Sequence, residues 1–283
     1  MTSGLTRRDF LVHGTAAALL AGLWPGRGRA GDAPRGEAGD FDFIAVNDLH
    51  FADPRKCPPW FDQAFDAMKV SAPKAELVLV SGDLSTHATE PQLGGLRECL
   101  ERLKLPVHVT PGNHDVAKDG SHALYDRQFP TRVNYAVEHR GWQFFHLNSA
   151  ESRAAEGTRI PPATLRWLDD NLKKFDPRKP TVISTHFPLG PRIVRRPRNA
   201  DDLLRRFERF NLRAIFNGHW HGQTQSVVRD AVVTTDRCCS RRRGNHDGSP
   251  LKGWFVCEAR AGTITRRFAS VPAAPMKPAR PRS

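Results

Sequence analysis

Short apolar runs that are each followed by polar, metal-binding types of side chain constrain this sequence more than any other feature. Five such runs cover residues 41–46, 77–80, 107–109, 181–184 and 212–216. A short continuous apolar run is typical of a strand that is buried on both faces of a sheet. Residues 60–70 and 93–105, between the first three runs, show the apolar spacing of helices. The first third of the chain therefore predicts β-α units whose strands end in polar residues.

The rest of the chain continues the mixed pattern. Residues 134–138 and 143–148 predict a hairpin, and residues 162–175 predict a helix with Pro162 at its start. Acidic residues open a second expected helix at 201–210, where they complement the helix dipole. Strands around 226–234 and 254–265 complete the expected domain. We predict one α/β domain over residues 41–270.

The polar residues at the expected strand ends form a coherent set. In an open α/β sheet such strand ends line a common crevice. Two pairs in the set are separated by a single residue, so the side chains of each pair point the same way in extended chain. Carboxylate, amide and imidazole groups without a thiol suit Mn, Fe, Zn or Co. The set is Asp48, His50, Asp83, Asn113, His114, His186, His219 and His221.

Each of these motifs taken alone also fits an ordinary turn, and the order of all five supports a shared site. Asp83 offers two oxygens, so it can bridge two cations. The letters Gly112-Asn113-His114-Asp115 recur at Gly244-Asn245-His246-Asp247. We interpret the second copy as coincidence and as a turn before the last strand. The histidines outside the set are interpreted as core or surface residues.

Together, Asp48-x-His50, Gly82-Asp83, Gly112-Asn113-His114-Asp115, His186 and Gly218-His219-x-His221 resemble the motifs of the calcineurin-like metallophosphoesterase superfamily. Class III cyclic nucleotide phosphodiesterases and related secreted enzymes show the strongest resemblance, over about residues 41–270. The resemblance implies a four-layer α/β/β/α sandwich of two mixed sheets. It also implies that Asp48, His50, Asp83 and His221 hold one metal, and that Asp83, Asn113, His186 and His219 hold the other.

The same resemblance implies hydrolysis of phosphoesters by a metal-bridging hydroxide, with His114 protonating the leaving group. Asp115 is expected to orient the imidazole of His114. Thr86 stands where purple acid phosphatases carry a tyrosine. A tyrosinate–iron centre is therefore not expected. The metals are two divalent or trivalent ions of unknown identity.

The net charge of +13 favours an anionic partner. Residues 1–30 contribute +3 of it, and the remaining +10 lies in residues 31–283. Arg192, Arg195, Arg241 and Arg242 are candidates to bind the far part of a phosphoester, because a guanidinium group can form paired hydrogen bonds with phosphate. The alternative is that they are ordinary solvated surface residues. We expect a phosphodiester substrate, possibly nucleotide-like in chemistry, and no stable nucleic-acid partner. A broad phosphomonoesterase and a catalytically silent anion-binding metalloprotein remain open alternatives.

The N-terminal segment of the chain predicts export. Residues 1–30 resemble a twin-arginine signal, with Arg7-Arg8 before an apolar run that is too short to span a bilayer, and a cleavage site after Ala30. This implies a periplasmic or secreted protein without a transmembrane segment in its mature form. Residues 31–40 are expected to be a linker and 271–283 a disordered tail. The five cysteines show no metal-binding spacing and are interpreted as buried thiols.

Overall fold

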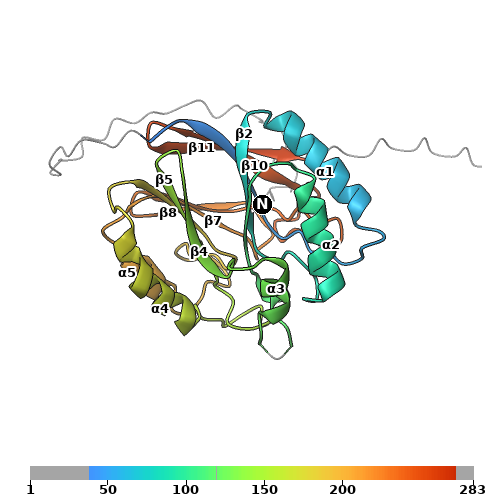
Figure 1. The fold of residues 1–283 in the computed structure, drawn as a ribbon, viewed down its shortest axis with the longest axis horizontal. Helices are drawn as coiled ribbons and strands as arrows, with labels where there is room; N and C mark the ends of the chain where they lie inside the picture. The colour runs from blue at the N-terminus through green and yellow to red at the C-terminus, as the bar shows by residue number, and fades with distance from the viewer. Residues whose placement is uncertain (1–37, 119, 272–283) are drawn as a thin grey trace, which may run out of the picture. The chain divides into compact units, whose positions relative to one another are not determined.

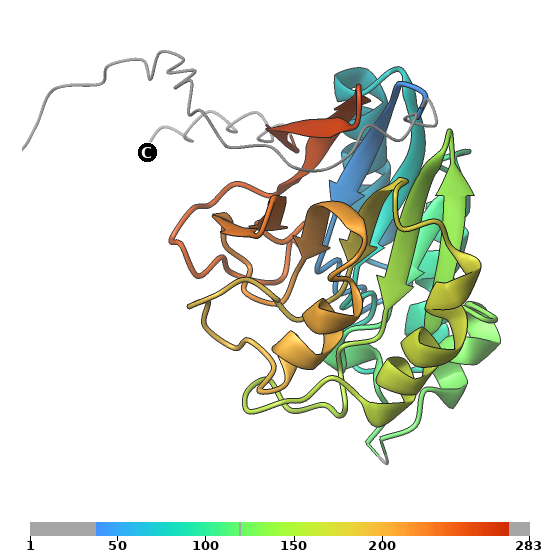
Figure 2. The same cartoon turned by 90° about the vertical axis from the view of Figure 1, so that its left-hand side faces the viewer.

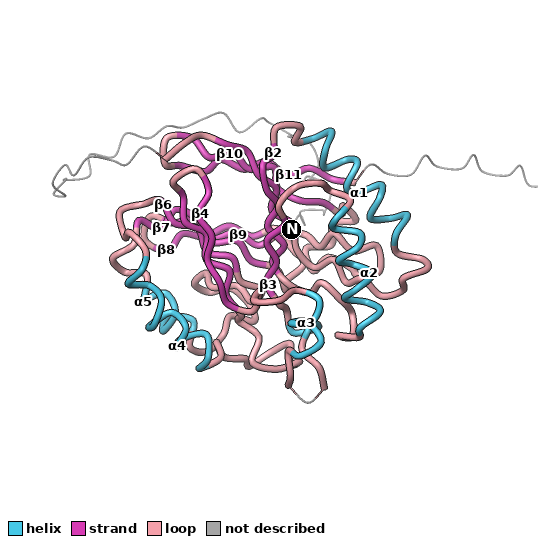
Figure 3. The backbone as a smooth tube through the Cα atoms, viewed as in Figure 1, coloured by secondary structure: helices cyan, strands magenta, loops and turns pink. Residues whose placement is uncertain are grey.

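Two β-sheets form the framework of the domain (Figures 1 and 3). The computed structural model describes residues 38–118 and 120–271. One sheet has the strand order β11-β10-β1-β2-β3, and the other has the order β4-β5-β6-β7-β9-β8. The strands are β1 (Phe41–Val46), β2 (Ala75–Ser81), β3 (Val107–Thr110), β4 (Asn134–His139), β5 (Trp142–Leu147), β6 (Pro180–Ser184), β7 (Asn211–Asn217), β8 (Thr224–Val228), β9 (Ala231–Thr235), β10 (Gly253–Arg260) and β11 (Thr263–Ser270).

Both sheets are mixed, as expected from the sequence. Strands β1, β2 and β3 run parallel, and the β10–β11 hairpin joins β1 antiparallel. Strands β5, β6, β7 and β9 are parallel, with β4 and β8 antiparallel at the two edges. The carboxyl ends of β1, β2 and β3 therefore meet at one edge of the first sheet, and those of β6 and β7 meet at one edge of the second.

Helices cover the outer face of each sheet. These are α1 (Pro58–Ser71), α2 (Glu90–Glu101) and α3 (Ala123–Gln128) on the first, and α4 (Pro162–Asn171) and α5 (Ala200–Arg206) on the second. Figures 1 and 2 show the two groups of helices on opposite sides of the paired sheets. Single turns of 3₁₀-helix follow β3 at Asn113–Asp115 and α4 at Leu172–Lys174.

The alternation of side chains along the strands produces three apolar layers. In β1, Phe43 and Ala45 pack between the sheets, whereas Ile44 and Val46 pack against the helices. The outer face of the second sheet packs separately against α4 and α5. The four-layer α/β/β/α sandwich is thereby confirmed.

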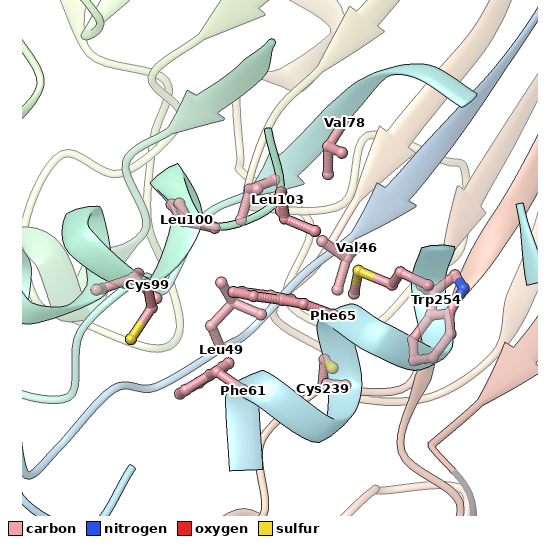
Figure 4. Packing of buried hydrophobic residues seen from close by; sticks show 14 of the residues in the cluster. Val46, Leu49, Phe61, Phe65, Val78, Cys99, Leu100, Leu103, Cys239 and Trp254 are labelled. Carbon is pink, nitrogen blue, oxygen red and sulfur yellow. The ribbon is translucent and has the colours of Figure 1, made fainter. Parts of the chain in front are cut away.

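Leu49 anchors the loop that follows β1 in the layer between the first sheet and its helices. Figure 4 shows it in the same cluster as Phe61 and Phe65 of α1. Leu49 is buried, and it lies in sequence between Asp48 and His50. Burial of one side chain thus fixes the loop that carries two of the candidate ligands.

The structure corrects several boundaries. Residues 226–234 and 254–265, expected as single strands, are the hairpins β8–β9 and β10–β11, because positive-φ residues at Arg229 and Ala261 reverse the chain. Helix α3 was not expected. Ala38 packs on the domain although it lies in the expected linker. Val271 is buried although it lies in the expected tail, and its amide donates to the Lys252 carbonyl.

The expected signal at 1–30 lies outside the described residues, as do 31–37 and 272–283. None of the helices within 38–118 and 120–271 has the length and apolar character needed to cross a bilayer. The five cysteines are all free and buried.

Candidate metal centre

The loops after five parallel strands bring the candidate ligands together at one end of the two sheets. In the first sheet, the amides of Asp48 and His50 donate to the carbonyls of Gly82 and Asp83, which joins the loops after β1 and β2. In the second sheet, the amide of Gly218 donates to the carbonyl of His186, which joins the loops after β6 and β7. The ligand positions are therefore set by backbone hydrogen bonds as well as by the strands.

Two groups of buried side chains result. Asp48, His50, Asp83 and His221 form the first group, and Asp83, His186 and His219 form the second. Within each group the potential ligand atoms all lie within 4.8 Å of one another. The side-chain oxygen of Asn113 joins the second group, 3.1 Å from Nε2 of His186.

The carboxylate of Asp83 lies between the two groups. Its Oδ2 is 3.5 Å from Nε2 of His50, and its Oδ1 is 3.2 Å from Nε2 of His186. Each oxygen thus faces a different group. This is the position that the sequence predicted for a bridging carboxylate.

Asp48 presents one oxygen to the first group and uses the other to hold the loops. Its Oδ2 accepts hydrogen bonds from the backbone amide of His219 at 2.9 Å and from the side-chain amide of Asn47. Its Oδ1 lies 3.1 Å from Nε2 of His221. No backbone amide in the described residues donates to this Oδ1.

Pairs of imidazole nitrogens face each other across each group. Nε2 of His50 lies 3.1 Å from Nε2 of His221, and Nε2 of His186 lies 3.1 Å from Nδ1 of His219. Two nitrogens that would share one ion at the usual ligand distance of about 2.0–2.1 Å can lie at most about 4.2 Å apart. The spacing of these nitrogens therefore fits shared coordination of a cation.

Backbone carbonyls select the nitrogen that each histidine presents. The opposite ring nitrogens of His186, His219 and His221 contact carbonyl oxygens at 3.1, 2.8 and 3.1 Å. A carbonyl can only accept, so each of these nitrogens carries a proton, and the inward nitrogen is the one that can bind a cation. The accepting carbonyls belong to Ser81, Ala155 and Gly244, and none was identified from the sequence.

The site concentrates negative charge away from water. Burial opposes ionisation of Asp48 and Asp83, but the neighbouring imidazoles, led by His221 for Asp48 and by His186 for Asp83, hold the pKa of both below the ordinary value. Burial lowers the pKa of His50 and of His219 to about 3, so these rings are neutral at neutral pH.

A cation is needed to balance these carboxylates. Burial lowers the pKa of His221, but the adjacent Asp48 carboxylate outweighs it and raises that pKa to about 11. A buried carboxylate pair without a cation is costly. The residues present therefore fit a pair of metal ions, which would compete with this proton for the same nitrogen.

Five of the predicted ligands adopt left-handed backbone conformations. The φ angles of Asp48, His50 and Asp83 are 53°, 46° and 49°, and those of His219 and His221 are 68° and 45°. Such conformations are uncommon outside glycine, although Asp and His adopt them more readily than most residues. Each costs on the order of 1–3 kcal/mol and persists where the surroundings impose it. The strain is concentrated where the ligands converge.

Comparisons with known proteins agree with this geometry. A family model for calcineurin-like phosphoesterases matches residues 41–223. The chain belongs to this family. A 3′,5′-cyclic-nucleotide phosphodiesterase of Nostoc sp. is 29% identical over 155 residues, which are 53% of this chain and 57% of that protein. A probable glycerophosphodiester phosphodiesterase of Arcobacter nitrofigilis is 26% identical over 66% of this chain and 71% of its own length.

A solved structure shares the fold. A dimetal phosphatase from Danio rerio superimposes with a TM-score of 0.58 at 13% identity, over 82% of this chain and 98% of that one. At this identity the likeness concerns the fold alone. The calcineurin-like domain of this chain therefore carries the family's fold.

His114 of the calcineurin-like domain is held beside the metal-binding groups without belonging to either. Its backbone amide donates to Oδ1 of Asp83 at 2.9 Å. Its ring lies across that of His50, with centroids 4.8 Å apart. Nδ1 lies 2.8 Å from the carbonyl oxygen of Thr86, so Nδ1 carries a proton and Nε2 is left for other partners.

The expected role of Asp115 is wrong. Its carboxylate accepts from the backbone amides of Leu84, Ser85 and Gly112 at 2.7–2.9 Å and from the hydroxyl of Ser85. These bonds join the loop after β2 to the loop after β3. The carbonyl of Thr86, and not this carboxylate, holds the His114 ring, because the carboxylate is already saturated by loop donors.

Gly112 lies against Asp83 so closely that no side chain fits. A Cβ at this position would be 2.2 Å from Oδ1 and 2.3 Å from the backbone nitrogen of Asp83. We predict that Gly112→Ala loses metal and about 1–3 kcal/mol of stability, because backbone must move. Metal analysis and thermal unfolding test this. Gly94→Ala, whose Cβ would make only an ordinary contact with the Gln128 side chain at 3.5 Å, is the control; equal behaviour of the two variants would contradict the prediction.

The second Asn-His-Asp copy forms the expected turn, in which the amide of Gly248 donates to the carbonyl of Asn245, and the loop that carries it also contacts the ligand histidines. The Gly244 carbonyl holds His221, and the ring of His246 stacks on Trp220 at 4.7 Å between centroids. Trp220 lies in sequence between His219 and His221. The motif letters alone could not show this, because the contacts come from a backbone carbonyl and a ring face.

The four candidate arginines lie in different surroundings. Arg241 and Arg242 line a cavity that His50 also lines. The guanidinium of Arg195 lies 5.8 Å from the centre of the Trp220 ring, next to the ligand histidines. Arg192 is exposed, and the structure shows it in no contact with the other described candidates. Three of the four arginines therefore lie beside the metal-binding groups.

Proposed function

We propose that this protein hydrolyses phosphodiesters with two metal ions held by Asp48, His50, Asp83, Asn113, His186, His219 and His221. The observation that carries the proposal is Asp83, whose two oxygens face separate ligand groups while its Oδ1 also holds the amide of His114. When bound, two metal ions supply activated water at neutral pH and neutralise charge on a phosphate undergoing displacement. Mn, Fe, Zn and Co suit this donor set.

The chain's own residues supply positioning and a proton. The Thr86 carbonyl accepts a hydrogen bond from Nδ1 of His114, so that the doubly protonated imidazolium ring presents Nε2–H, which gives its proton to the departing oxygen and leaves the ring neutral. Asp115 keeps the loop that carries His114 against the loop that carries Asp83. The centre therefore combines a fixed acid with a site for paired cations.

Diesters are favoured because relatives named as a cyclic-nucleotide phosphodiesterase and a probable glycerophosphodiester phosphodiesterase match 53% and 66% of this chain. Initial rates with bis-p-nitrophenyl phosphate and p-nitrophenyl phosphate, measured with added Mn²⁺, test the preference. A higher kcat/KM for the diester supports the proposal. A higher value for the monoester makes the protein a phosphomonoesterase, and no turnover of either with two bound metals makes it a binding protein.

Metal removal is expected to abolish hydrolysis and to lower the melting temperature. Dialysis against a chelator leaves buried carboxylates without a cation, and a ligand at 100 times its Kd stabilises a fold by about 2.7 kcal/mol. Elemental analysis, calorimetry and turnover are measured before dialysis, after it and after return of Mn²⁺. Full activity in metal-free protein would contradict the mechanism.

We also propose that residues 1–30 direct twin-arginine export to the periplasm or beyond. The support is the Arg7-Arg8 pair before a mildly apolar run. Conversion of both residues to Lys should leave the protein in the cytoplasm, as judged by cell fractionation. Lys at Arg27 and Arg29 is the matched control, which should still be exported; export of the first variant would contradict this route.

A further inference from the structure

A cavity opens beside His50, on the side of the centre formed by α1 and the loop after β9. Its volume is about 280 Å³. His50, Lys56, Trp60, Phe61, Arg241 and Arg242 contribute to its wall. Because His50 belongs to a metal-binding group, a phosphate bound at the centre would lie next to this space.

The wall of the cavity is fixed by hydrogen bonds. The indole nitrogen of Trp60 donates to the carbonyl of Cys239 at 3.0 Å. The amide of Cys239 in turn donates to the carbonyl of Asn47, which precedes the ligand Asp48. The amide of Arg242 donates to the hydroxyl of Ser240. The cavity and the metal-binding loop are therefore parts of one bonded network.

The two arginines at this cavity lack the carboxylate partners that other arginines of the domain have. Arg140 pairs with Glu76, and Arg206 pairs with Asp169, both on the surface. Within the described part of the chain, Arg241 and Arg242 form no ion pair. Lys56 is 3.7 Å from Asp53 and largely exposed. Among the described residues, the two guanidinium groups of this face are therefore not paired with a carboxylate, whereas Lys56 is.

The size and composition of the cavity limit what it can hold. Sites for small molecules measure roughly 300–1,000 Å³, so this cavity of about 280 Å³ lies just below that range. Trp60, which is half-buried, provides an apolar surface beside the cationic residues. Guanidinium groups match phosphate oxygens with paired hydrogen bonds. A phosphate with part of a sugar suits this space better than a nucleobase.

We propose that this cavity binds a second phosphate on the sugar of the substrate, so that the preferred ligands are nucleotide-like molecules with two separate phosphates. The inference rests on the proposed function, because the first phosphate occupies the metal centre. Lys56, Arg241 and Arg242 hold the second phosphate, and Trp60 contacts the sugar.

Adenosine 5′-monophosphate and adenosine 3′,5′-bisphosphate differ only by the second phosphate and serve as probes. Their Kd values are measured by calorimetry on the full-length, Mn²⁺-loaded protein, and their inhibition constants are measured against bis-p-nitrophenyl phosphate. We expect the bisphosphate to bind about tenfold or more tightly than the monophosphate. In Arg241→Ala/Arg242→Ala this ratio should fall toward one.

The control variant Arg166→Ala/Arg209→Ala removes the same charge from exposed positions in α4 and after α5. Its ratio of affinities for the two probes should equal that of the unchanged protein. Equal affinity for the two probes, or a ratio that survives loss of Arg241 and Arg242, overturns the inference. Equal loss in both double variants assigns the effect to net charge and also overturns it. Absence of hydrolysis would contradict the proposed function and not this inference. The ratio of the two Kd values would still test whether the cavity binds a second phosphate.

Discussion

Asp83→Asn is expected to reduce bound metal from about two ions per chain to fewer than one and to lower kcat by about 10³ or more. The carboxylate faces both ligand groups, so its charge is lost to both sites together. A thousandfold loss corresponds to about 4 kcal/mol of transition-state stabilisation. Elemental analysis and initial rates with bis-p-nitrophenyl phosphate measure the two effects.

Thermal unfolding separates this loss from misfolding. Asp83→Asn removes buried charge, so the metal-free variant should melt no lower than the metal-free parent. The rise in melting temperature that Mn²⁺ gives the parent should be absent from the variant. Asp66→Asn, at an exposed position of α1, should retain metal and activity. Two tightly bound ions in Asp83→Asn would show that this carboxylate does not bridge the sites.

His114→Ala is expected to retain its metals and to lose about 10²–10⁴ in kcat. Neither ligand group includes the His114 ring, and its backbone bond to Asp83 survives the substitution. The loss should be larger for an alkyl leaving group than for p-nitrophenolate, because p-nitrophenolate departs without a proton. Rates for matched aryl and alkyl diesters measure how the loss in kcat depends on the leaving group. Elemental analysis measures whether the metals are retained.

His87→Ala is the matched control for this variant. His87 is an exposed histidine next to Thr86, and it contributes no atom to the ligand groups. Its removal should change kcat less than about threefold. An equal loss for aryl and alkyl leaving groups in His114→Ala would assign His114 to charge stabilisation and not to proton donation. An unchanged kcat would remove it from the mechanism.

The strands that carry the metal centre and the candidate ligands at their ends were predictable from the sequence, because both depend on local patterns. Apolar runs predicted β1, β2, β3, β6 and β7, and the residues that follow them are those that converge. The hairpin turns at Arg229 and Ala261 were missed because the residue that begins each turn is not a glycine, although it has a positive φ angle. Asp115 was misassigned because a carboxylate beside a histidine fits both an orienting and a loop-binding role.

The sequence by itself determined the kinds of ligand, their order and their places at strand ends, because those properties follow from residue chemistry and from the periodicity of strands and helices. Only the tertiary structure decided which nitrogen each histidine presents, since the deciding carbonyls of Ser81, Ala155 and Gly244 have no side-chain signature. It also decided the cavity at Lys56 and Arg241, which joins segments far apart in the chain. Contacts made through backbone atoms and across long sequence separations exist only once the chain has folded.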